Sequence, residues 1–227
     1  EIRYVGGCIR KIIQKELVDD IDLATNLTPQ EVCESLRKNN IKYYHTRAST
    51  SHQRNFGLTK IKYNNYIMFM DDDIIPLDDT FQKMDECIDK YGGDSNIGGF
   101  GFNQTQDIKY SFLDKLKNIG LVGYFDIYPS MPGKVAKSGW HSKIQNLKED
   151  ILADWVFTSM CIYKREDIKN FKFDESFGKY SYLEDLDFSL NLSKKNKKIY
   201  ISSKAKFLHP HNIDRSSFRF GITEIVN

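Results

Sequence analysis

Residues 65–76 read Asn-Tyr-Ile-Met-Phe-Met-Asp-Asp-Asp-Ile-Ile-Pro, and this stretch decides the predicted fold. The run from Tyr66 to Met70 is apolar or aromatic throughout, which is typical of a strand buried on both faces in a parallel sheet covered by helices. Three carboxylates follow at once, and burying an unpaired carboxylate costs several kcal/mol. We therefore expect them at the mouth of the sheet, in water or on a cation, where open α/β sheets bind ligands.

The three aspartates predict a metal site. If the chain stays extended, Asp71 and Asp73 point to one side of the strand and Asp72 points to the other. Two carboxylates on one side suit Mg²⁺ or Mn²⁺, because Mg²⁺ sites typically combine one or two carboxylates with substrate phosphates. The alternative is a solvated acidic turn, because Asp is common in loops, but the apolar strand in front favours the metal site.

Composition narrows the classes of function. The 227 residues allow one large domain or two small ones, and the net charge of +2 gives no general case for binding a nucleic acid or a membrane. DNA is therefore not an expected partner. The four cysteines include no C-x-x-C pair, so neither zinc nor a redox dithiol is indicated. Reduced thiols point to the cytoplasm, either free or peripheral at the inner membrane face, and no apolar run is long enough for a transmembrane helix.

The first 44 residues alternate between strand and helix patterns. Strands are expected at residues 2–5, 20–24 and 41–44. One helix is expected after the Gly6-Gly7 turn, and another begins at Pro29, which suits the first helical position. The predicted order of elements is therefore β-α-β-α-β.

Two segments of this stretch, Tyr4-Val5-Gly6-Gly7-Cys8-Ile9-Arg10 and Asp20-Ile21-Asp22-Leu23-Ala24-Thr25, resemble the head of class II tRNA nucleotidyltransferases and bacterial poly(A) polymerases. The resemblance implies a site for a triphosphate and Mg²⁺ that serves nucleotidyl transfer to RNA 3′ ends, built from Gly6, Gly7, Arg10, Asp20 and Asp22. Lys11 stands where the family usually has Asp, and the family's Arg-Arg-Asp-Phe-Thr segment has no counterpart here. A scaffold without polymerase chemistry is the alternative for residues 2–44.

A second resemblance begins further along the chain. The helical pattern around Arg54-Asn55-Phe56-Gly57, followed by the strand that ends in Asp71-Asp72-Asp73, resembles the GT-A glycosyltransferases of family 2. It implies that Arg54 and Asn55 lie near the nucleotide. It also implies that Asp71 and Asp73 hold Mn²⁺ or Mg²⁺ on the diphosphate, and that Asp71 and Asp72 contact the nucleotide-sugar. The alternative for Arg54 and Asn55 is an ordinary exposed helix.

The same family has a second motif, which here is Phe173-Asp174-Glu175-Ser176-Phe177 followed by Glu184-Asp185-Leu186-Asp187. Leucines recur at helical spacing from Leu183 onward, so the acids are expected in the first turn of a helix. The resemblance implies that Asp185, or else Glu184, is the general base that deprotonates the acceptor hydroxyl. The alternative is that these acids only complement the helix dipole.

Three more residues are implicated by the resemblance. Asp154 and Trp155 would touch sugar, because carboxylates and aromatic faces suit hydroxyl-rich ligands. His209 would lie near the metal or the diphosphate. Core packing of Trp155 and a structural role for His209 are the alternatives.

Together these patterns predict an α/β fold with a three-layer α/β/α, GT-A-like (Rossmann-like) mixed sheet and helices on both faces. Residues 1–44 would be a nucleotidyltransferase-head-like part that completes or imitates the sheet, and residues 45–227 a glycosyltransferase-like region. The predicted function is metal-dependent, inverting transfer of a sugar from a nucleotide-sugar donor, with UDP-sugar favoured, to a carbohydrate or other hydroxyl acceptor. The alternatives are nucleotidyl transfer to RNA 3′ ends, of the CCA-adding or poly(A) polymerase type, and a chimeric remnant without activity.

Overall fold

The structure is a computed structural model. It describes residues 2–5, 22–25, 44, 46–47, 49–61, 65–71, 74–105, 128–129, 131–177 and 183–209, with the backbone alone described for the first two ranges. The chain divides into two compact units. Unit 1 comprises Glu1–Arg47 and Pro210–Asn227, and unit 2 comprises Ala48–His209.

Unit 1 contains two described strands, β1 (Ile2–Val5) and β2 (Asp22–Thr25), which pair antiparallel with Val5 opposite Asp22. Both strands confirm the sequence prediction. They form a two-stranded sheet separate from the sheet of unit 2. The predicted helices of this stretch lie outside the described residues. The domain boundary near residue 44, and a contribution of residues 1–44 to the larger sheet, stay predictions.

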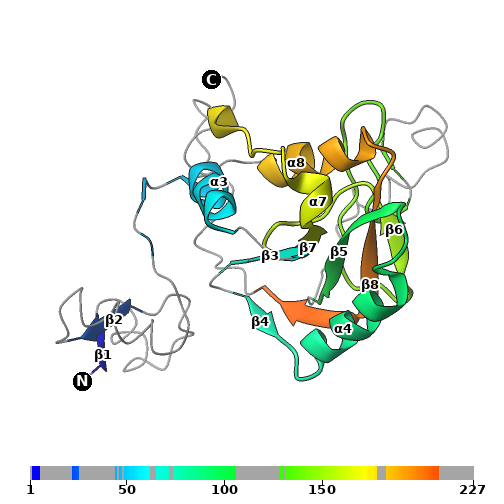
Figure 1. The fold of residues 1–227 in the computed structure, drawn as a ribbon. Helices are drawn as coiled ribbons and strands as arrows, with labels where there is room; N and C mark the ends of the chain where they lie inside the picture. Colours follow the sequence, from blue (N-terminus) through cyan, green and yellow to red (C-terminus); the bar gives the residue numbers. More distant parts are fainter. Residues whose placement is uncertain are drawn as a thin grey trace. The chain divides into compact units, whose positions relative to one another are not determined.

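Unit 2 is built on one mixed sheet (Figure 1). Its strands, in spatial order, are β3 (Tyr66–Met70), β7 (Met160–Lys164), β5 (Ile97–Gln104), β8 (Lys198–Leu208) and β4 (Ile75–Pro76), and β6 (Ile151–Ala153) also pairs with β8. Strands β5 and β8 pair in parallel, whereas the other described pairs are antiparallel. The predicted mixed α/β fold is therefore confirmed.

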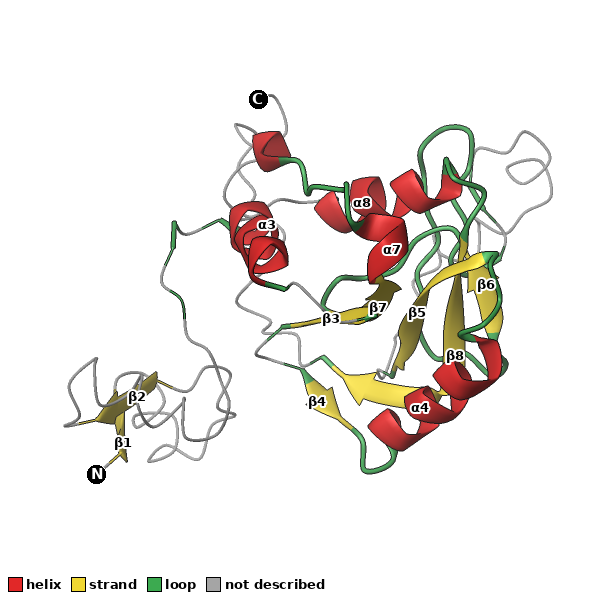
Figure 2. Cartoon of the chain, viewed as in Figure 1, coloured by secondary structure: helices red, strands yellow, loops and turns green. Residues whose placement is uncertain are grey.

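Helices accompany this sheet, as Figure 2 shows. They are α3 (Thr50–Lys60), α4 (Thr80–Tyr91), α7 (Arg165–Ile168) and α8 (Glu184–Ser193), with a short 3-10 helix η1 (Glu175–Phe177). Side chains alternate along β7, so that Tyr163 joins a core with Phe188 of α8 while Ile162 joins a second core with Met84 of α4. Apolar cores thus form on both faces of the sheet.

Strand β3 corrects one sequence prediction. The strand exists where it was expected, but it runs antiparallel to β7 at one end of the sheet order, so the prediction of a parallel neighbourhood is wrong. Ile67 is buried, whereas Met68 is 37% and Met70 53% exposed, so the strand is not buried on both faces. Five apolar residues in a row hide the in-and-out alternation that a polar residue would have revealed.

Strand β8 curls, and this curl brings its end to β4. The register with β5 jumps between Phe102 opposite Ser202 and Asn103 opposite Lys206, which leaves a bulge around Ser203. Asp150 accepts hydrogen bonds of 2.7 Å each from the Ser203 N–H, the Ser203 hydroxyl and the Tyr200 hydroxyl. Burial acts to raise the pKa of Asp150, but these hydrogen bonds outweigh it and lower the pKa below its usual value. The bulged backbone is therefore satisfied by side chains.

Candidate functional site

Arg54 joins two acids that are far apart in the sequence. From α3 its Nη2 donates to Oδ1 of Asp71 at 3.0 Å, directly after β3, and its Nη1 donates to Oε1 of Glu184, the first residue of α8. Thr158 donates its hydroxyl to the same Glu184 oxygen at 3.2 Å. The side chains of Arg54 and Glu184 are 12% and 9% exposed, whereas that of Asp71 is 38% exposed. The ion pair to Glu184 is therefore buried, while Asp71 keeps access to solvent.

Asp185 stands beside this ion pair and has an unusual pKa. Burial raises the pKa of its carboxyl from 3.8 to about 6. A hydrogen bond of 2.7 Å from the Leu186 N–H to Oδ1 and the charge of Arg54 act in the opposite direction, and the charge of Asp71 adds to the rise. We name Arg54, Asp71, Glu184 and Asp185 the Arg54 cluster. It contains a carboxyl that changes protonation close to neutral pH, which suits proton transfer.

The Phe173 segment fixes α3 and α8 relative to each other. The guanidinium of Arg54 lies over the Phe173 ring at 5.5 Å, and that ring stacks on Phe188 of α8 with centroids 4.0 Å apart. Asn55 clamps the Phe173 backbone, since its Nδ2 donates to the carbonyl at 2.9 Å and its Oδ1 accepts from the N–H at 2.8 Å. Nδ2 of Asn55 also donates to Glu175 at 3.1 Å. This clamp gives Asn55 a structural role, and its predicted contact with the nucleotide stays a prediction.

A cleft of about 340 Å³ opens between α3 and β3 and reaches Asp71. Its lining residues are Thr50, Gln53, Arg54, Gly57, Leu58, Ile61, Ile67, Met68, Phe69, Met70 and Asp71. Gly57 faces open space, because a Cβ placed there would meet no atom within 4 Å. A small ligand could therefore approach the backbone of α3 beside Arg54.

Gly57→Ala is expected to stabilise unit 2 by about 0.5–1 kcal/mol, because glycine inside a helix costs that much relative to alanine and nothing opposes the added methyl group. Urea unfolding of both proteins measures the difference. Gly93→Ala is the control, since Gly93 also faces open space but lies after the end of α4. A destabilised Gly57→Ala protein would show that the cleft is tighter than described.

The predicted metal ligands are only partly described. Asp71 directly follows β3, but Asp72 and Asp73 lie outside the described residues. Within the described ranges, no group of three or more His, Cys, Asp or Glu side chains is placed to hold a metal ion. Strand β4 pairs with β8 through Ile75 opposite Leu208, and extending this register by one step places His209 opposite Ile74, the residue after Asp73. The fold thus brings His209 close to Ile74.

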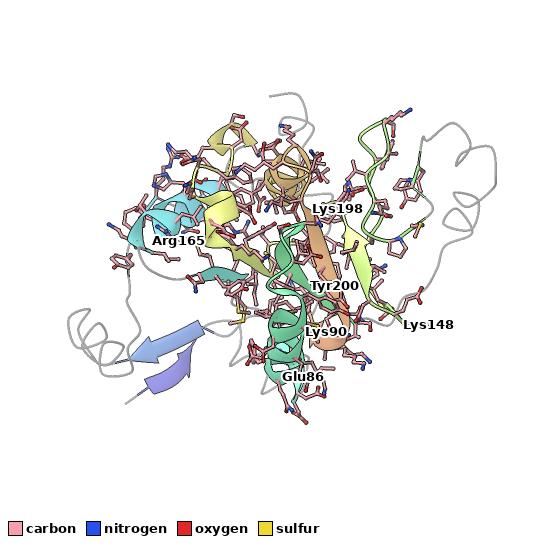
Figure 3. The ribbon with its side chains drawn as sticks, turned by 45° about the vertical axis from the view of Figure 1, so that its right-hand side comes forward. Glu86, Lys90, Lys148, Arg165, Lys198 and Tyr200 are labelled. Carbon is pink, nitrogen blue, oxygen red and sulfur yellow. The ribbon has the colours of Figure 1, made fainter. Side chains whose placement is uncertain are left out.

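The structure places the two predicted sugar-contacting residues differently. Trp155 is 1% exposed in the core, and its Nε1 donates to the Ser142 carbonyl at 3.1 Å, so its position argues against a stacking contact with sugar. Asp154 forms ion pairs with Lys198 at 2.7 Å and with Lys134 at 3.5 Å (Lys198 is labelled in Figure 3). Burial acts to raise the pKa of Asp154, but the two lysines and a backbone N–H lower it below its usual value.

Sequence reasoning gave no role to Phe173 or Thr158. Phe173 was quoted within the second motif, but its position under Arg54 is set by tertiary packing. A lone threonine such as Thr158 carries no pattern that identifies its hydrogen bond to Glu184.

The alternative nucleotidyl-transfer site cannot be assembled from the described residues. Asp22 begins β2, with its backbone alone described. The other predicted members of that site lie outside the described residues, namely Gly6, Gly7, Arg10 and Asp20. This site stays a prediction.

Comparison with known families matches residues 2–70 to the poly(A) polymerase head domain. The match confirms the resemblance of residues 2–44 to the nucleotidyltransferase head. It also extends through α3 and β3. Arg54 therefore belongs to both the matched head region and the Arg54 cluster.

Comparison with curated proteins gives no match. Among solved structures, the chain is similar to the crystal structure of A197 from STIV, with 20% sequence identity, 78% of this chain and 76% of that chain covered, and a TM-score of 0.42. A likeness at this level supports no conclusion about function. Within the described part of the chain, no helix is both long enough and apolar enough to cross a membrane.

Proposed function

We propose that unit 2 is the catalytic part of a metal-dependent glycosyltransferase of GT-A type, with its mixed sheet as the middle of three layers. It would move a sugar from a nucleotide-sugar, with UDP-sugar favoured, to a hydroxyl group of a carbohydrate or similar acceptor. One observation carries this proposal. Asp71 at the end of β3 and the Glu184-Asp185 pair at the start of α8 belong to a single cluster joined by Arg54, beside an open cleft.

The proposed roles follow from charge and protonation. Asp185 accepts the proton of the acceptor hydroxyl as that oxygen forms a bond to the anomeric carbon, while the bond from that carbon to the diphosphate oxygen breaks. A pKa of about 6 leaves Asp185 mostly ionised at neutral pH and still basic enough to take a proton. Attack from the face opposite the leaving group inverts the anomeric centre. Arg54 holds Glu184 in place and lies close enough to the cleft to contact the diphosphate.

Asp71, with Asp73 and with His209 near the same part of the chain, would hold the divalent cation. Carboxylate and imidazole ligands suit Mn²⁺, and carboxylates plus diphosphate oxygens suit Mg²⁺. When bound, such an ion stabilises the negative charge of the leaving diphosphate as a Lewis acid. The partial exposure of Asp71 supports this role, because a ligand can reach its carboxylate from solvent.

A second candidate function is nucleotidyl transfer to RNA 3′ ends, and the match of residues 2–70 to the poly(A) polymerase head domain favours it over glycosyl transfer. Gly6, Gly7 and Arg10 would then hold a nucleoside triphosphate, and Asp20 and Asp22 would bind Mg²⁺. Against it stands the near-neutral charge of the chain, because RNA-binding proteins usually carry a basic surface. A chain that binds no nucleotide would be a remnant without either activity.

Thermal unfolding with different nucleotides distinguishes these functions. A ligand that binds only the folded state at about 100 times its Kd adds about 2.7 kcal/mol of stability, which raises the Tm of a chain of this size by about 5–10 °C. The glycosyltransferase proposal predicts that UDP with Mn²⁺ raises the Tm and that CTP or ATP with Mn²⁺ does not. The opposite pattern supports nucleotidyl transfer, and no shift with any nucleotide contradicts both.

Substitutions locate the binding site within the same experiment. Asp73→Asn is expected to remove stabilisation by UDP with Mn²⁺, and Asp22→Asn is expected to remove stabilisation by CTP or ATP. Asp78→Asn is the matched control, because Asp78 is an exposed carboxylate in the turn after β4. A UDP shift that survives Asp73→Asn would contradict the proposed metal site.

A further inference from the structure

A second pocket lies at the other end of β3. Its volume is about 440 Å³, and its lining residues are Asn65, Tyr66, Gly92, Lys164, Arg165, Glu166 and Lys169. Tyr66 begins β3 and Lys164 stands opposite it at the end of β7. We name this the Lys164 pocket. The four strand residues Ile67 to Met70 separate Tyr66 from Asp71, a span of roughly 16 Å. The two pockets share no lining residue, so they are distinct.

The Lys164 pocket is positively charged. Lys164, Arg165 and Lys169 face a single carboxylate among the lining residues, that of Glu166. Three cations against one acid leave an excess of positive charge in a concave site, where low-dielectric walls concentrate the field. The net charge of the chain is only +2, so this excess is a local feature.

Lys164 is a buried cation. It is 6% exposed, and its Nζ donates to the Asp94 carbonyl at 2.7 Å. That carbonyl lies just after the end of α4, so the helix dipole favours a cation there. The carbonyl accepts one of the three ammonium hydrogens of Lys164. Within the described residues, Lys164 forms no ion pair with a carboxylate. Because a buried charge without a counter-ion is costly, an anion in the pocket would stabilise this arrangement.

The backbone of Arg165 is fixed by a hydrogen bond, whereas its guanidinium makes only one weak contact within the described residues. Its N–H donates to the Asn65 carbonyl at 2.9 Å, which fixes the start of α7 against the start of β3. Its guanidinium makes one long hydrogen bond of 3.4 Å to the Ile61 carbonyl. A guanidinium fork binds phosphate or carboxylate through two parallel hydrogen bonds, and an ammonium adds a point charge. The pocket therefore combines a rigid backbone with donors suited to an anion.

We propose that the Lys164 pocket binds the phosphate group of a small phosphorylated molecule such as a sugar phosphate. The phosphate would lie between Lys164 and Arg165, with Lys169 at the rim. The volume falls within the range of small-molecule sites and exceeds what inorganic phosphate needs, so part of the ligand beyond the phosphate fits inside. This inference stands independently of the proposed sugar transfer, because it concerns binding at the opposite end of β3.

Isothermal titration calorimetry at low ionic strength tests the inference with glucose 6-phosphate, inorganic phosphate and glucose as probes. Glucose 6-phosphate is expected to bind more tightly than phosphate, and glucose is expected not to bind. Arg165→Gln and Lys169→Gln are each expected to weaken binding by roughly three- to tenfold, since each removes one cation. Glu166→Gln is expected to tighten binding by roughly twofold, because it removes the opposing charge.

Lys148→Gln is the matched control, because Lys148 is exposed and lies well away from Arg165 (Figure 3). It is expected to leave binding unchanged. Equal losses in Lys148→Gln and Arg165→Gln would show that the anion responds only to overall charge, and the inference would be overturned. Absence of binding by both phosphorylated probes at millimolar concentration would overturn it as well.

Discussion

Asp185→Asn is expected to stabilise the folded chain by about 2–3 kcal/mol at pH 8 and to remove sugar transfer. Burial raises the pKa of this carboxyl from 3.8 to about 6, so the folded chain holds the proton more tightly than the unfolded chain does. The ionised form therefore destabilises the fold. An amide of nearly the same shape removes that cost and can keep the hydrogen bond from the Leu186 N–H.

The stability gained by Asp185→Asn depends on pH. Below about pH 4 the carboxyl is protonated in both the folded and the unfolded chain, so wild type and variant are expected to be equally stable. As the pH rises from about 4 to about 6, the wild type loses stability relative to Asp185→Asn. Above about pH 7 the difference is constant. Urea unfolding at pH values across this range measures the whole curve.

Asp187→Asn is the matched control for both effects. Asp187 lies two residues further along α8, and its backbone carbonyl rather than its carboxylate accepts the hydrogen bond from Asn191. Under the proposed function, release of UDP from UDP-sugars falls about 10³-fold in Asp185→Asn and changes little in Asp187→Asn. If Asp185→Asn is no more stable than the wild type at pH 8, the raised pKa of Asp185 is contradicted. If Asp185→Asn is stabilised but fully active, only the general-base role is contradicted.

The sequence predicted which segments form the Arg54 cluster, but not which side chains pair within it. Two motifs separated by more than 100 residues implicated Asp71 and Asp185, and the fold does bring β3 and the start of α8 to the same guanidinium. The partnership of Arg54 with Glu184 could not be predicted, because an isolated Arg in a helix has many carboxylates it could reach. Tertiary packing through Phe173 and Phe188 decides which one it meets.

Apolar and aromatic residues misled the prediction for a related reason. The run from Tyr66 to Met70 carries no polar residue, so hydrophobic periodicity could not distinguish a central strand from an edge strand with exposed methionines. Trp155 is equally suited by composition to a sugar platform or a core, and its Nε1–H finds the Ser142 carbonyl inside the core. In both cases burial is set by neighbours that are distant in the sequence.

Arg54→Met is expected to lower the free energy of unfolding of unit 2 by about 3–5 kcal/mol. Glu184 is almost fully buried, and Arg54 is its counter-charge. Methionine fills much of the same volume but leaves the carboxylate with the Thr158 hydroxyl as its remaining described donor. Arg54→Lys keeps the charge but loses the fork that reaches Glu184 and Asp71 together, so an intermediate loss is expected.

A double-mutant cycle separates this ion pair from simple loss of packing. Glu184→Gln in the Arg54→Met background is expected to recover at least half of the lost stability, because it removes the uncompensated charge that the first substitution creates. Arg165→Met is the control, since its guanidinium has one long hydrogen bond and a change below about 1 kcal/mol is expected. If Arg54→Met and Arg165→Met cost the same, Arg54 does not hold the acids together. If the double substitution recovers nothing, the loss comes from the packing of Arg54 on Phe173 and not from its pairing with Glu184.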